Sequence, residues 1–523
     1  MFKEKLKEVF DSKLKIAATI CSVVWFILYF ALGANFFDNM WNTSPALPFI
    51  GGVFALIPII LQTVNLLFWK NKWLDICVIA ESLAFSLVHF FFFAFVLSKL
   101  SYFLITGTPY FITIGLIALI AFFVFVFPKL QKILKQITAV GLTIIILIIC
   151  IICLFDATPF YVSAGATVFA VEDEYQIAFA TSHKSTGAIE IDGTTYYDQT
   201  DGQNNISTLH KISVPADKLD INKKYSVITQ SVPINSAYLP SKGRVIKNDY
   251  TFRPIDESDG IQIYNLSDTH ECIGGPVNAA SYFGDKLDLL ILNGDIINDI
   301  SGESQIAIIY KIANKITNGS RPVIFTRGNH ECNGKLAADL GKYVGSTNNG
   351  MYYTYSIGNT IAMLVLDTNN DMADDNKLLS PIANFDIVRK EQTEWIKQNS
   401  DWNKGYQFSF VVAHMAYPLS GYIEDKNSWS GWAKELVSLT NGKTDLLLSG
   451  HSHKTDFIKA GTDDNKIADF PVLRGSLRSN KYSNKEGVSP NEFTGTAIEI
   501  IGGKINVKFT NAKGEIKNEF WLN

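Results

Sequence analysis

Five short groups of potential metal-ligand residues, lying between residues 268 and 453, constrain the fold of this chain more than any other feature. Five of its eight histidines fall in this stretch. Each group closely follows a short apolar run of the kind that forms a buried strand, such as residues 287–292. The candidates therefore lie where strands end and loops begin, and helical candidates between the runs indicate a layered α/β fold. The candidate residues are Asp268, His270, Asp295, Asn329, His330, Glu331, His414, His451 and His453.

These side chains offer oxygen and imidazole donors. That donor set suits Mn, Fe, Zn or similar ions, and a carboxylate can bridge two of them. We therefore expect two divalent or mixed-valence metal ions as cofactors.

The series resembles the motifs of the calcineurin-like metallophosphoesterase superfamily, and all five blocks stand in the usual order in the second half of the chain. Scattered core and loop histidines are the alternative, and five blocks in order argue against it. The resemblance implies hydrolysis of phosphoesters by a metal-bridging hydroxide, with His330 as the acid and Glu331 steadying it. The implied ligands are Asp268, His270, Asp295 and His453 in one metal site, and Asp295, Asn329, His414 and His451 in the other.

Arg327 directly precedes the third block, and the string Arg-Gly-Asn-His-Glu also occurs in Ser/Thr phosphatases of the superfamily. Its planar guanidinium could clamp a phosphate oxygen as a further catalytic group, or it could form a salt bridge within the fold. Two departures limit the resemblance. Asn298 stands where purple acid phosphatases have a tyrosine ligand and Ser/Thr phosphatases an aspartate, and His270 stands where purple acid phosphatases have glycine. Neither an iron–tyrosinate site nor a His–Asp dyad is expected.

The first 155 residues are apolar and raise the hydrophobic content of the whole chain to 47%. Each of their five apolar runs approaches or exceeds the roughly 20 residues that a helix needs to cross a bilayer. The prediction is an all-α transmembrane bundle of five helices. The runs lie at about 16–37, 47–69, 74–97, 103–127 and 137–155.

Lysines gather before the first run, between the second and third, and between the fourth and fifth. The positive-inside bias then predicts a multi-pass cell-membrane protein with a cytoplasmic N-terminus and an extracytoplasmic catalytic domain, in contact with membrane lipid. Glu81 and His89 lie within the third run. They either face other helices or extend to the membrane interface, or they hold a lipid headgroup or shape a pathway.

Residues from about 160 to 250 show short alternating runs, and Asp192-Gly193 supplies a tight turn between two of them. This pattern predicts a small antiparallel β-sandwich, and a sandwich before the catalytic domain resembles the layout of purple acid phosphatases. The chain is thus expected to hold three domains. These are a membrane domain at 1–155, a fibronectin-like sandwich at 156–250 and a metallophosphoesterase domain at 251–523.

The expected function is a membrane-anchored phosphatase or phosphodiesterase. A net charge of −4 gives no basic footprint for nucleic acid. The alternative is a membrane receptor or a lipid or transport accessory protein that uses a phosphatase-like domain as a binding module. Substrate choice is expected in loops 271–283, 368–384 and 415–432, the last contributing Tyr417, Tyr422 and Trp429. Cys272 and Cys332 follow motif histidines and form either a disulfide or two separate thiols.

Overall fold

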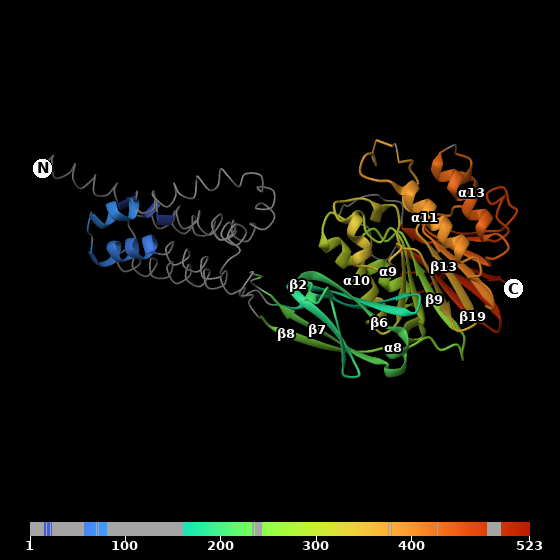
Figure 1. Ribbon diagram of the computed structural model, residues 1–523, viewed down its shortest axis with the longest axis horizontal. Helices are drawn as coiled ribbons and strands as arrows, with labels where there is room; N and C mark the ends of the chain where they lie inside the picture. Colours follow the sequence, from blue (N-terminus) through green and yellow to red (C-terminus); the bar gives the residue numbers. More distant parts are fainter. Residues whose placement is uncertain are drawn as a thin grey trace. The chain divides into compact units, whose positions relative to one another are not determined.

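The structure is a computed structural model (Figure 1). It describes residues 160–232, 235, 243–374, 376–377, 379–425, 427–478 and 493–522, and short stretches at 15–16, 18–20, 22–23, 57–69, 71 and 73–80. The chain divides into two compact units. One comprises Met1–Pro159 and Val232–Gly243, and the other comprises Phe160–Ser231 and Arg244–Asn523.

The predicted bundle of five transmembrane helices was wrong. Among the residues that the structure describes, no helix is long and apolar enough to cross a membrane. One described stretch ends in the π-helix η2 (Asn65–Trp69), and buried Gln62 and Asn65 both donate to the Asp75 carboxylate, at 3.0 and 2.9 Å. Hydropathy averaged along a run fixes neither where a helix ends nor whether polar side chains within the run pair with one another.

Most of the five apolar runs, including Glu81 and His89, lie outside the described residues. The cell-membrane location, the orientation of the chain and the contact with lipid were inferred from these runs. They stay predictions.

Two β-sheets form the framework of the second unit. The thirteen-stranded sheet has the order β21-β20-β19-β9-β10-β11-β1-β2-β7-β8, with β18 paired to β19 and with β3 and β6 paired to β2. The six-stranded sheet has the order β12-β13-β14-β15-β17-β16, and β4 (Gln199–Thr200) pairs with β5 (Gln203–Asn204). The larger sheet comprises β1 (Val162–Val171), β2 (Glu174–Ile191), β3 (Thr194–Tyr197), β6 (Ser207–Pro215), β7 (Lys224–Ser231), β8 (Val245–Thr251), β9 (Ile261–Leu266), β10 (Leu289–Asn293), β11 (Pro322–Thr326), β18 (Leu477–Arg478), β19 (Phe493–Ile501), β20 (Lys504–Asn511) and β21 (Ile516–Leu522). The smaller comprises β12 (Tyr353–Ile357), β13 (Ile361–Leu366), β14 (Phe408–Ala413), β15 (Leu446–Ser449), β16 (Thr455–Ile458) and β17 (Val472–Gly475).

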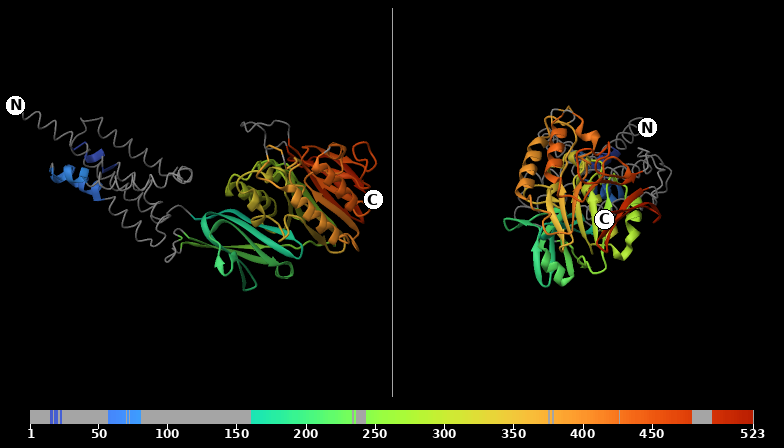
Figure 2. Two further views of the ribbon diagram at one scale, coloured as in Figure 1. Left: turned by 45° about the horizontal axis from the view of Figure 1, so that its top comes forward. Right: turned by 90° about the vertical axis from the view of Figure 1, so that its right-hand side faces the viewer.

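Helices cover the sheets, as Figures 1 and 2 show. Helices α9 (Gly274–Ala280) and α10 (Glu303–Thr317) pack on the larger sheet, and α11 (Phe385–Gln398) and α13 (Ser428–Thr440) pack against each other beside the smaller one. Helix α10 buries Ile306, Ile309 and Ile312 because apolar residues at this spacing share one helical face. The shorter helical elements are α8 (Ala216–Asn222), η4 (Ser281–Lys286), η5 (His330–Cys332), η6 (Ala337–Lys342) and α12 (Ser420–Ile423).

The apolar core lies in two layers. Buried side chains from both sheets form one cluster, in which Leu290 and Phe325 of the larger sheet join Met363 and Phe410 of the smaller. A second cluster joins alternate residues of the smaller sheet, such as Leu364, to the helices beside it. The order of layers is therefore helices, sheet, sheet, helices.

Two sets of parallel strands place their carboxyl ends close to one another. Strands β9, β10 and β11 are parallel neighbours in the larger sheet, and β13, β14 and β15 are parallel neighbours in the smaller. All six are buried along their whole length. In parallel sheets the loops after the carboxyl ends gather at one edge, and five of these six loops carry a predicted metal-ligand group.

The separate β-sandwich expected at 156–250 was also wrong as a fold. Strand β1 pairs in parallel with β11, with Val168 opposite Pro322 and Phe169 opposite Val323. Strands β1, β2, β3, β6, β7 and β8 thereby extend the larger sheet. The supported class is a β-rich α/β fold. Local alternation predicts a strand but carries no information about a partner some 150 residues away. The predicted boundaries at 156 and 251 stay predictions.

This continuous sheet predicts that two sets of strands unfold together: the middle strands, from β1 to β8, and the strands that carry the predicted ligands, from β9 to β15. Phe169 of β1 is fully buried, and its ring meets those of Tyr310 and Phe325 edge-on at 6.3 and 6.2 Å. We expect Phe169→Ala to lower the free energy of unfolding by about 3–5 kcal/mol. Urea denaturation followed by tryptophan fluorescence would measure this, because five of the nine tryptophans lie after residue 251. They are Trp395, Trp402, Trp429, Trp432 and Trp521.

Tyr197→Ala is the control, because Tyr197 is 56% exposed, and it should leave the transition unchanged. A tryptophan transition that Phe169→Ala does not shift would show that the two sets of strands unfold independently.

Candidate metal centre

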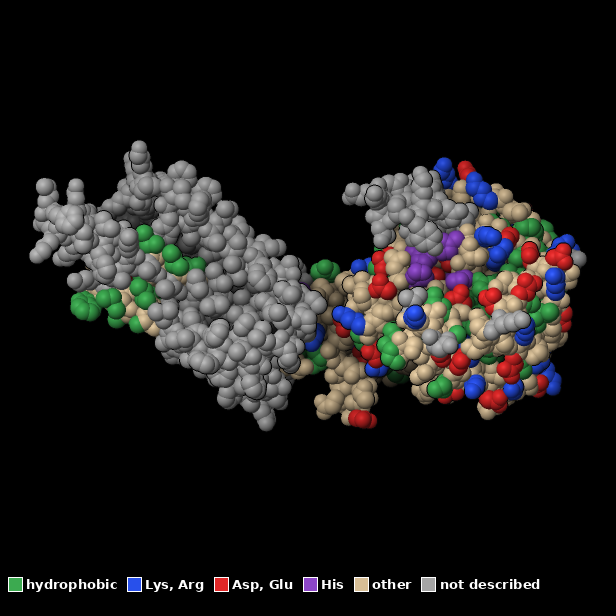
Figure 3. Space-filling view, turned by 90° about the horizontal axis from the view of Figure 1, so that it is seen from above, with side chains coloured by type: hydrophobic (Ala, Val, Ile, Leu, Met, Phe, Trp, Pro, Cys, Tyr) green, Lys and Arg blue, Asp and Glu red, His purple; other side chains and the backbone are tan. Residues whose placement is uncertain are grey.

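The predicted ligands come together at the carboxyl ends of the strands, where a patch of histidine side chains is visible on one face of the molecule (Figure 3). They arrive from five loops. Asp268 and His270 follow β9, Asp295 follows β10, Asn329 and His330 follow β11, His414 follows β14, and His451 and His453 follow β15.

The first group consists of Asp268, His270 and His453. Each offers one ligand atom, and these atoms all lie within 4.8 Å of one another. His270 Nε2 is 3.1 Å from His453 Nε2, and His453 Nε2 is 3.6 Å from Asp268 Oδ1. Two imidazole nitrogens this close share either a proton or a cation.

The second group consists of Asp295, His414 and His451. Asp295 Oδ2 is 3.2 Å from His414 Nε2 and 3.9 Å from His270 Nε2, a nitrogen of the first group. Asn329 Oδ1 is 2.8 Å from His451 Nδ1, so the Asn329 amide faces the same group. A single oxygen of Asp295 therefore lies between the two sets of donors, which is the position that a bridging carboxylate requires.

The backbone at these residues is strained. Non-glycine residues rarely adopt positive φ, and holding one there costs about 1–3 kcal/mol in sparsely populated regions. Such strain is found where the surrounding structure fixes the direction of a functional side chain. The φ angles are 54° at Asp268, 47° at His270, 52° at Asp295, 66° at His451 and 51° at His453.

Glycines before the ligands let the loops approach one another. A Cβ atom at Gly294 would lie 2.5 Å from His414 Nδ1, and a Cβ atom at Gly450 would lie 2.4 Å from Ser267 Oγ and 2.7 Å from Asp268 Oδ2. A side chain at either position would push a predicted ligand away.

Glu331 fixes the turn that carries Asp295. Its buried carboxylate accepts hydrogen bonds from the backbone N–H groups of four residues, at 2.8 to 3.1 Å. Charge-assisted bonds from several amides hold both partners firmly. The sequence resemblance gave Glu331 a supporting role beside His330, and these contacts show that it organises the Asp295 turn. The donors are Asp295, Ile296, Ile297 and Gly328.

His330 reaches the same centre from a more exposed position. Its Nδ1 is 2.7 Å from the carbonyl oxygen of Asn298, and its Nε2 is 3.9 Å from Asp295 Oδ2. A carbonyl can only accept, so Nδ1 of His330 carries a proton and Nε2 faces the centre. The side chain is 34% exposed, which suits a group that meets a substrate arriving from solvent.

The charged groups of the centre perturb one another. Burial would lower the pKa of His414, but the Asp295 carboxylate outweighs burial and raises it to about 10. Burial, opposed by His414 and reinforced by Asp295, raises the pKa of Asp268 to about 7. Burial and the neighbouring His414 lower the pKa of His451 to about 4.

The donor set fits divalent cations. Asp268 Oδ1 and His414 Nε2 are buried, and neither has a hydrogen-bond partner among the described residues. Both face the group of acids and imidazoles. Buried polar atoms without such a partner are costly, and a cation held by each donor group would satisfy the atom that belongs to that group.

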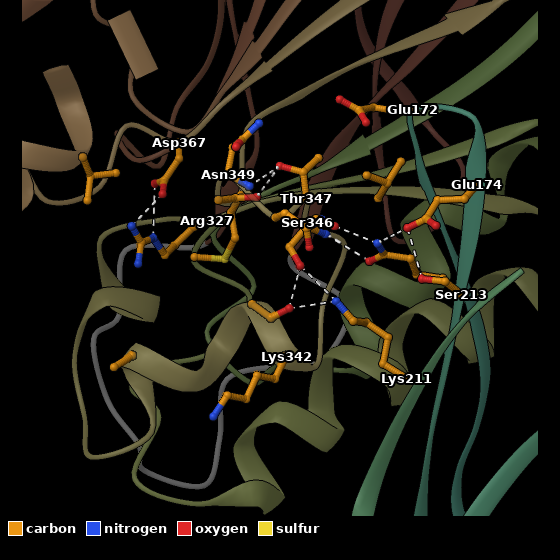
Figure 4. Close-up of a pocket in the computed structure, with 18 of the residues that line it drawn as sticks. Glu172, Glu174, Lys211, Ser213, Arg327, Lys342, Ser346, Thr347, Asn349 and Asp367 are labelled. Carbon is orange, nitrogen blue, oxygen red and sulfur yellow. Dashed lines mark hydrogen bonds and ion pairs between the residues drawn. The ribbon is translucent and has the colours of Figure 1, made fainter. Parts of the chain in front are cut away.

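Arg327 lies against a different pocket. Its Nε and Nη2 donate to the two carboxylate oxygens of Asp367, at 3.1 and 2.6 Å, and both side chains are buried. This bidentate pair lies in the wall of a cavity of about 710 Å³ (Figure 4). The geometry favours the salt bridge within the fold over a clamp on phosphate.

Of the three aromatic residues expected to contribute to substrate choice, two are buried in the core and one lies near the metal centre. Tyr417 and Trp429 are buried in the core beside the smaller sheet, so they are not available for stacking. The ring of Tyr422 lies 6.0 Å from that of His451. Cys272 and Cys332 are free thiols.

Sequence reasoning missed two contacts of the centre. Asp371 Oδ2 is 3.7 Å from His451 Nε2, and nothing in the polar loop 368–384 distinguished this residue from its neighbours. Asn298 was noticed only as a departure from related motifs. Its side chain lies 3.2 Å from His270 Nδ1, and its carbonyl oxygen meets His330.

Comparison with known proteins agrees with this geometry. Residues 261–455 match the family model described as calcineurin-like phosphoesterase. The matched stretch includes all seven predicted ligands. No curated protein matches the sequence.

Three solved structures are similar at low identity. A purple acid phosphatase from yellow lupin (Lupinus luteus) seeds is 11% identical, with a TM-score of 0.44, and the match covers 68% of this chain and 74% of that one. The structure of PhoD is 12% identical, with a TM-score of 0.41, over 70% and 90% of the two chains. A dimetal phosphatase from Danio rerio is 12% identical, with a TM-score of 0.35, over 51% and 99%. Similarity this weak supports no conclusion about activity.

The close packing at Gly450 predicts a selective loss of metal. Gly450→Ala should displace Asp268 and the turn before His451, and so reduce bound Mn²⁺ or Zn²⁺ by at least about tenfold at limiting metal. Metal content after gel filtration, measured by inductively coupled plasma mass spectrometry, would show this. Gly431→Ala in α13 is the control, because a Cβ atom there meets nothing within 4 Å. Full metal content in Gly450→Ala would contradict the packing argument.

The Arg327–Asp367 pair predicts a loss of stability that a second substitution repairs. Arg327→Gln leaves a buried carboxylate unpaired and should cost about 3–5 kcal/mol in the free energy of unfolding. The double variant Arg327→Gln/Asp367→Asn should recover most of it, whereas Lys342→Gln, at an exposed side chain, should leave the stability unchanged. Thermal and urea denaturation measure these changes. If the double variant regained stability but kept a raised KM, Arg327 would contact substrate after all.

Proposed function

We propose that the chain is a metal-dependent phosphoric ester hydrolase whose centre holds two divalent cations. The observation that carries the proposal is the position of Asp295 Oδ2 between His270 Nε2 of one donor group and His414 Nε2 of the other. The family match of residues 261–455 supports the same reaction class.

Two proposed cation positions follow from the donor groups. Asp268, His270, Asp295 and His453 would hold one cation, and Asp295, Asn329, His414 and His451 the other. Bound divalent cations supply Lewis-acid charge, which binds phosphate oxygens and lowers the pKa of water. Mn, Fe and Zn all accept such oxygen and imidazole donors.

The chain's own residues account for the remaining requirements. Glu331 and the strained turns hold the donors in place before substrate arrives, and this preorganisation contributes to catalysis because no reorganisation is needed during reaction. His330 carries a proton on Nδ1, which is fixed by the Asn298 carbonyl, and directs Nε2 at the centre. In this proposal a proton on Nε2 passes to the leaving oxygen as the ester bond to phosphorus breaks.

One assay tests this function. The full chain, freed of metal and reloaded with Mn²⁺, Zn²⁺, Fe²⁺ or Ni²⁺ in turn, would be offered a chromogenic phosphomonoester and the matching diester. We expect turnover with at least one metal, and a loss of at least about 10³-fold in kcat for Asp295→Asn, since a bridging carboxylate contributes to both cation positions.

His330→Ala should behave differently from Asp295→Asn. It should lower kcat by about 10²–10⁴-fold, because a general acid contributes that much. The loss should be smaller for esters whose leaving group is a stable anion. Absence of turnover with every metal and both substrates would favour the binding-module alternative.

A further inference from the structure

Asn298 contacts one imidazole of the first donor group, that of His270, and the imidazole of the proposed acid, His330. Its side-chain Oδ1 lies 3.2 Å from His270 Nδ1, and its carbonyl oxygen lies 2.7 Å from His330 Nδ1. The two rings meet edge-on, with their centroids 4.6 Å apart. One residue therefore contacts the outward-facing nitrogen of both rings.

Both rings direct their other nitrogen at the same oxygen. His270 Nε2 and His330 Nε2 each lie 3.9 Å from Asp295 Oδ2. When the Nδ1–H of an imidazole donates to an oxygen, Nε2 keeps its lone pair for a cation or carries the transferable proton. The contact with Asn298 thus determines which nitrogen of His270 faces the metal centre.

The loop that carries Asn298 is fixed on both sides. Before it, Ile297 donates its N–H to Glu331, at 3.1 Å. After it, Asp299 accepts from the N–H of Ser301 at 2.9 Å, and Ile300 donates to the Asn333 carbonyl at 2.8 Å. Ile297 and Ile300 are fully buried. The Asn298 acceptors are therefore held in position by packing and hydrogen bonds, as an orienting group must be.

The same loop is joined to the one that carries His270. His270 donates its N–H to the Asp295 carbonyl at 3.0 Å, and Glu271 donates to the Ile296 carbonyl at 2.8 Å. The backbone thus places His270 beside Asn298, but it leaves rotation of the His270 ring to its side-chain contacts.

We propose that Asn298 is a positioning residue that orients His270 through its side chain and His330 through its main chain. The inference rests on the proposed function for its catalytic meaning, but its metal-binding part stands alone. Substitution of Asn298 removes its side-chain contact with His270 Nδ1 and keeps its main-chain contact with His330, because every residue has a main-chain carbonyl.

The test measures Mn²⁺ binding to the full chain after removal of metal, using electron paramagnetic resonance of the free ion. The wild type should bind two Mn²⁺ per chain. Asn298→Ala should weaken one of the two sites about 10–100-fold, the usual effect of losing a hydrogen-bond partner of a metal-binding histidine. Asn298→Asp should restore affinity, because a carboxylate also accepts from Nδ1. Asp299→Asn, which keeps the Oδ1 acceptor for the Ser301 N–H, is the matched control and should bind like the wild type.

Kinetics separate positioning from a general loss of structure. At limiting Mn²⁺, Asn298→Ala should lower kcat with little change in KM, and high Mn²⁺ should restore the rate. The dependence of the rate on the leaving group should stay that of the wild type, since His330 keeps its partner. A positioning role leaves the thermal melting of the metal-free chain unchanged.

Three outcomes are distinguishable. Equal Mn²⁺ affinity in Asn298→Ala and the wild type would overturn the inference, whatever the turnover. Two bound Mn²⁺ in the wild type without hydrolysis would overturn the proposed function and leave the inference standing. Weak binding in both Asn298→Ala and Asn298→Asp, with a lowered melting temperature, would show that Asn298 is only structural.

Discussion

The buried carboxylate of Asp295 needs hydrogen-bond and ion-pair partners, and much of the surrounding structure supplies them. Its Oδ2 lies within 3.9 Å of three imidazole nitrogens, those of His270, His330 and His414, and its Oδ1 accepts the His330 backbone N–H at 3.0 Å. A buried charge needs such partners, because removal from water costs several kcal/mol per ion. The parallel strands, the left-handed turns and the glycines all bring donors from five loops to this one group.

The rigidity of the centre comes from backbone contacts more than from the ligands themselves. The Glu331 carboxylate accepts hydrogen bonds from four backbone amides around the Asp295 turn. The His270 loop is hydrogen-bonded to the same turn. Residues with positive φ are tolerated there because the surrounding contacts over-determine them. Each contact fixes a loop before any cation or substrate is bound. The geometry therefore supports chemistry that depends on preorganised charge.

The larger sheet joins this centre to the middle of the chain. Strand β1 lies beside β11, whose carboxyl end leads to Arg327, Asn329 and His330. The Arg327–Asp367 pair ties the start of that loop to the end of β13 in the other sheet. Stability of the middle strands is thus coupled to the loop that carries the proposed acid, although none of the middle strands supplies a predicted ligand.

The sequence by itself determined which residues could form the centre, because acids, an amide and imidazoles followed strand-like runs at five separate places. It also predicted that these strands belong to an α/β layered domain. Only the tertiary structure decided the rest. Three features depend on residues far apart in the chain. They are the parallel pairing of β1 with β11, the salt bridge between Arg327 and Asp367, and the burial of Trp429. Hydropathy along one segment cannot supply such contacts, and for the same reason it misjudged the apolar first part of the chain. The role of Asn298 likewise depends on where His270 and His330 point, which no spacing between motifs reveals.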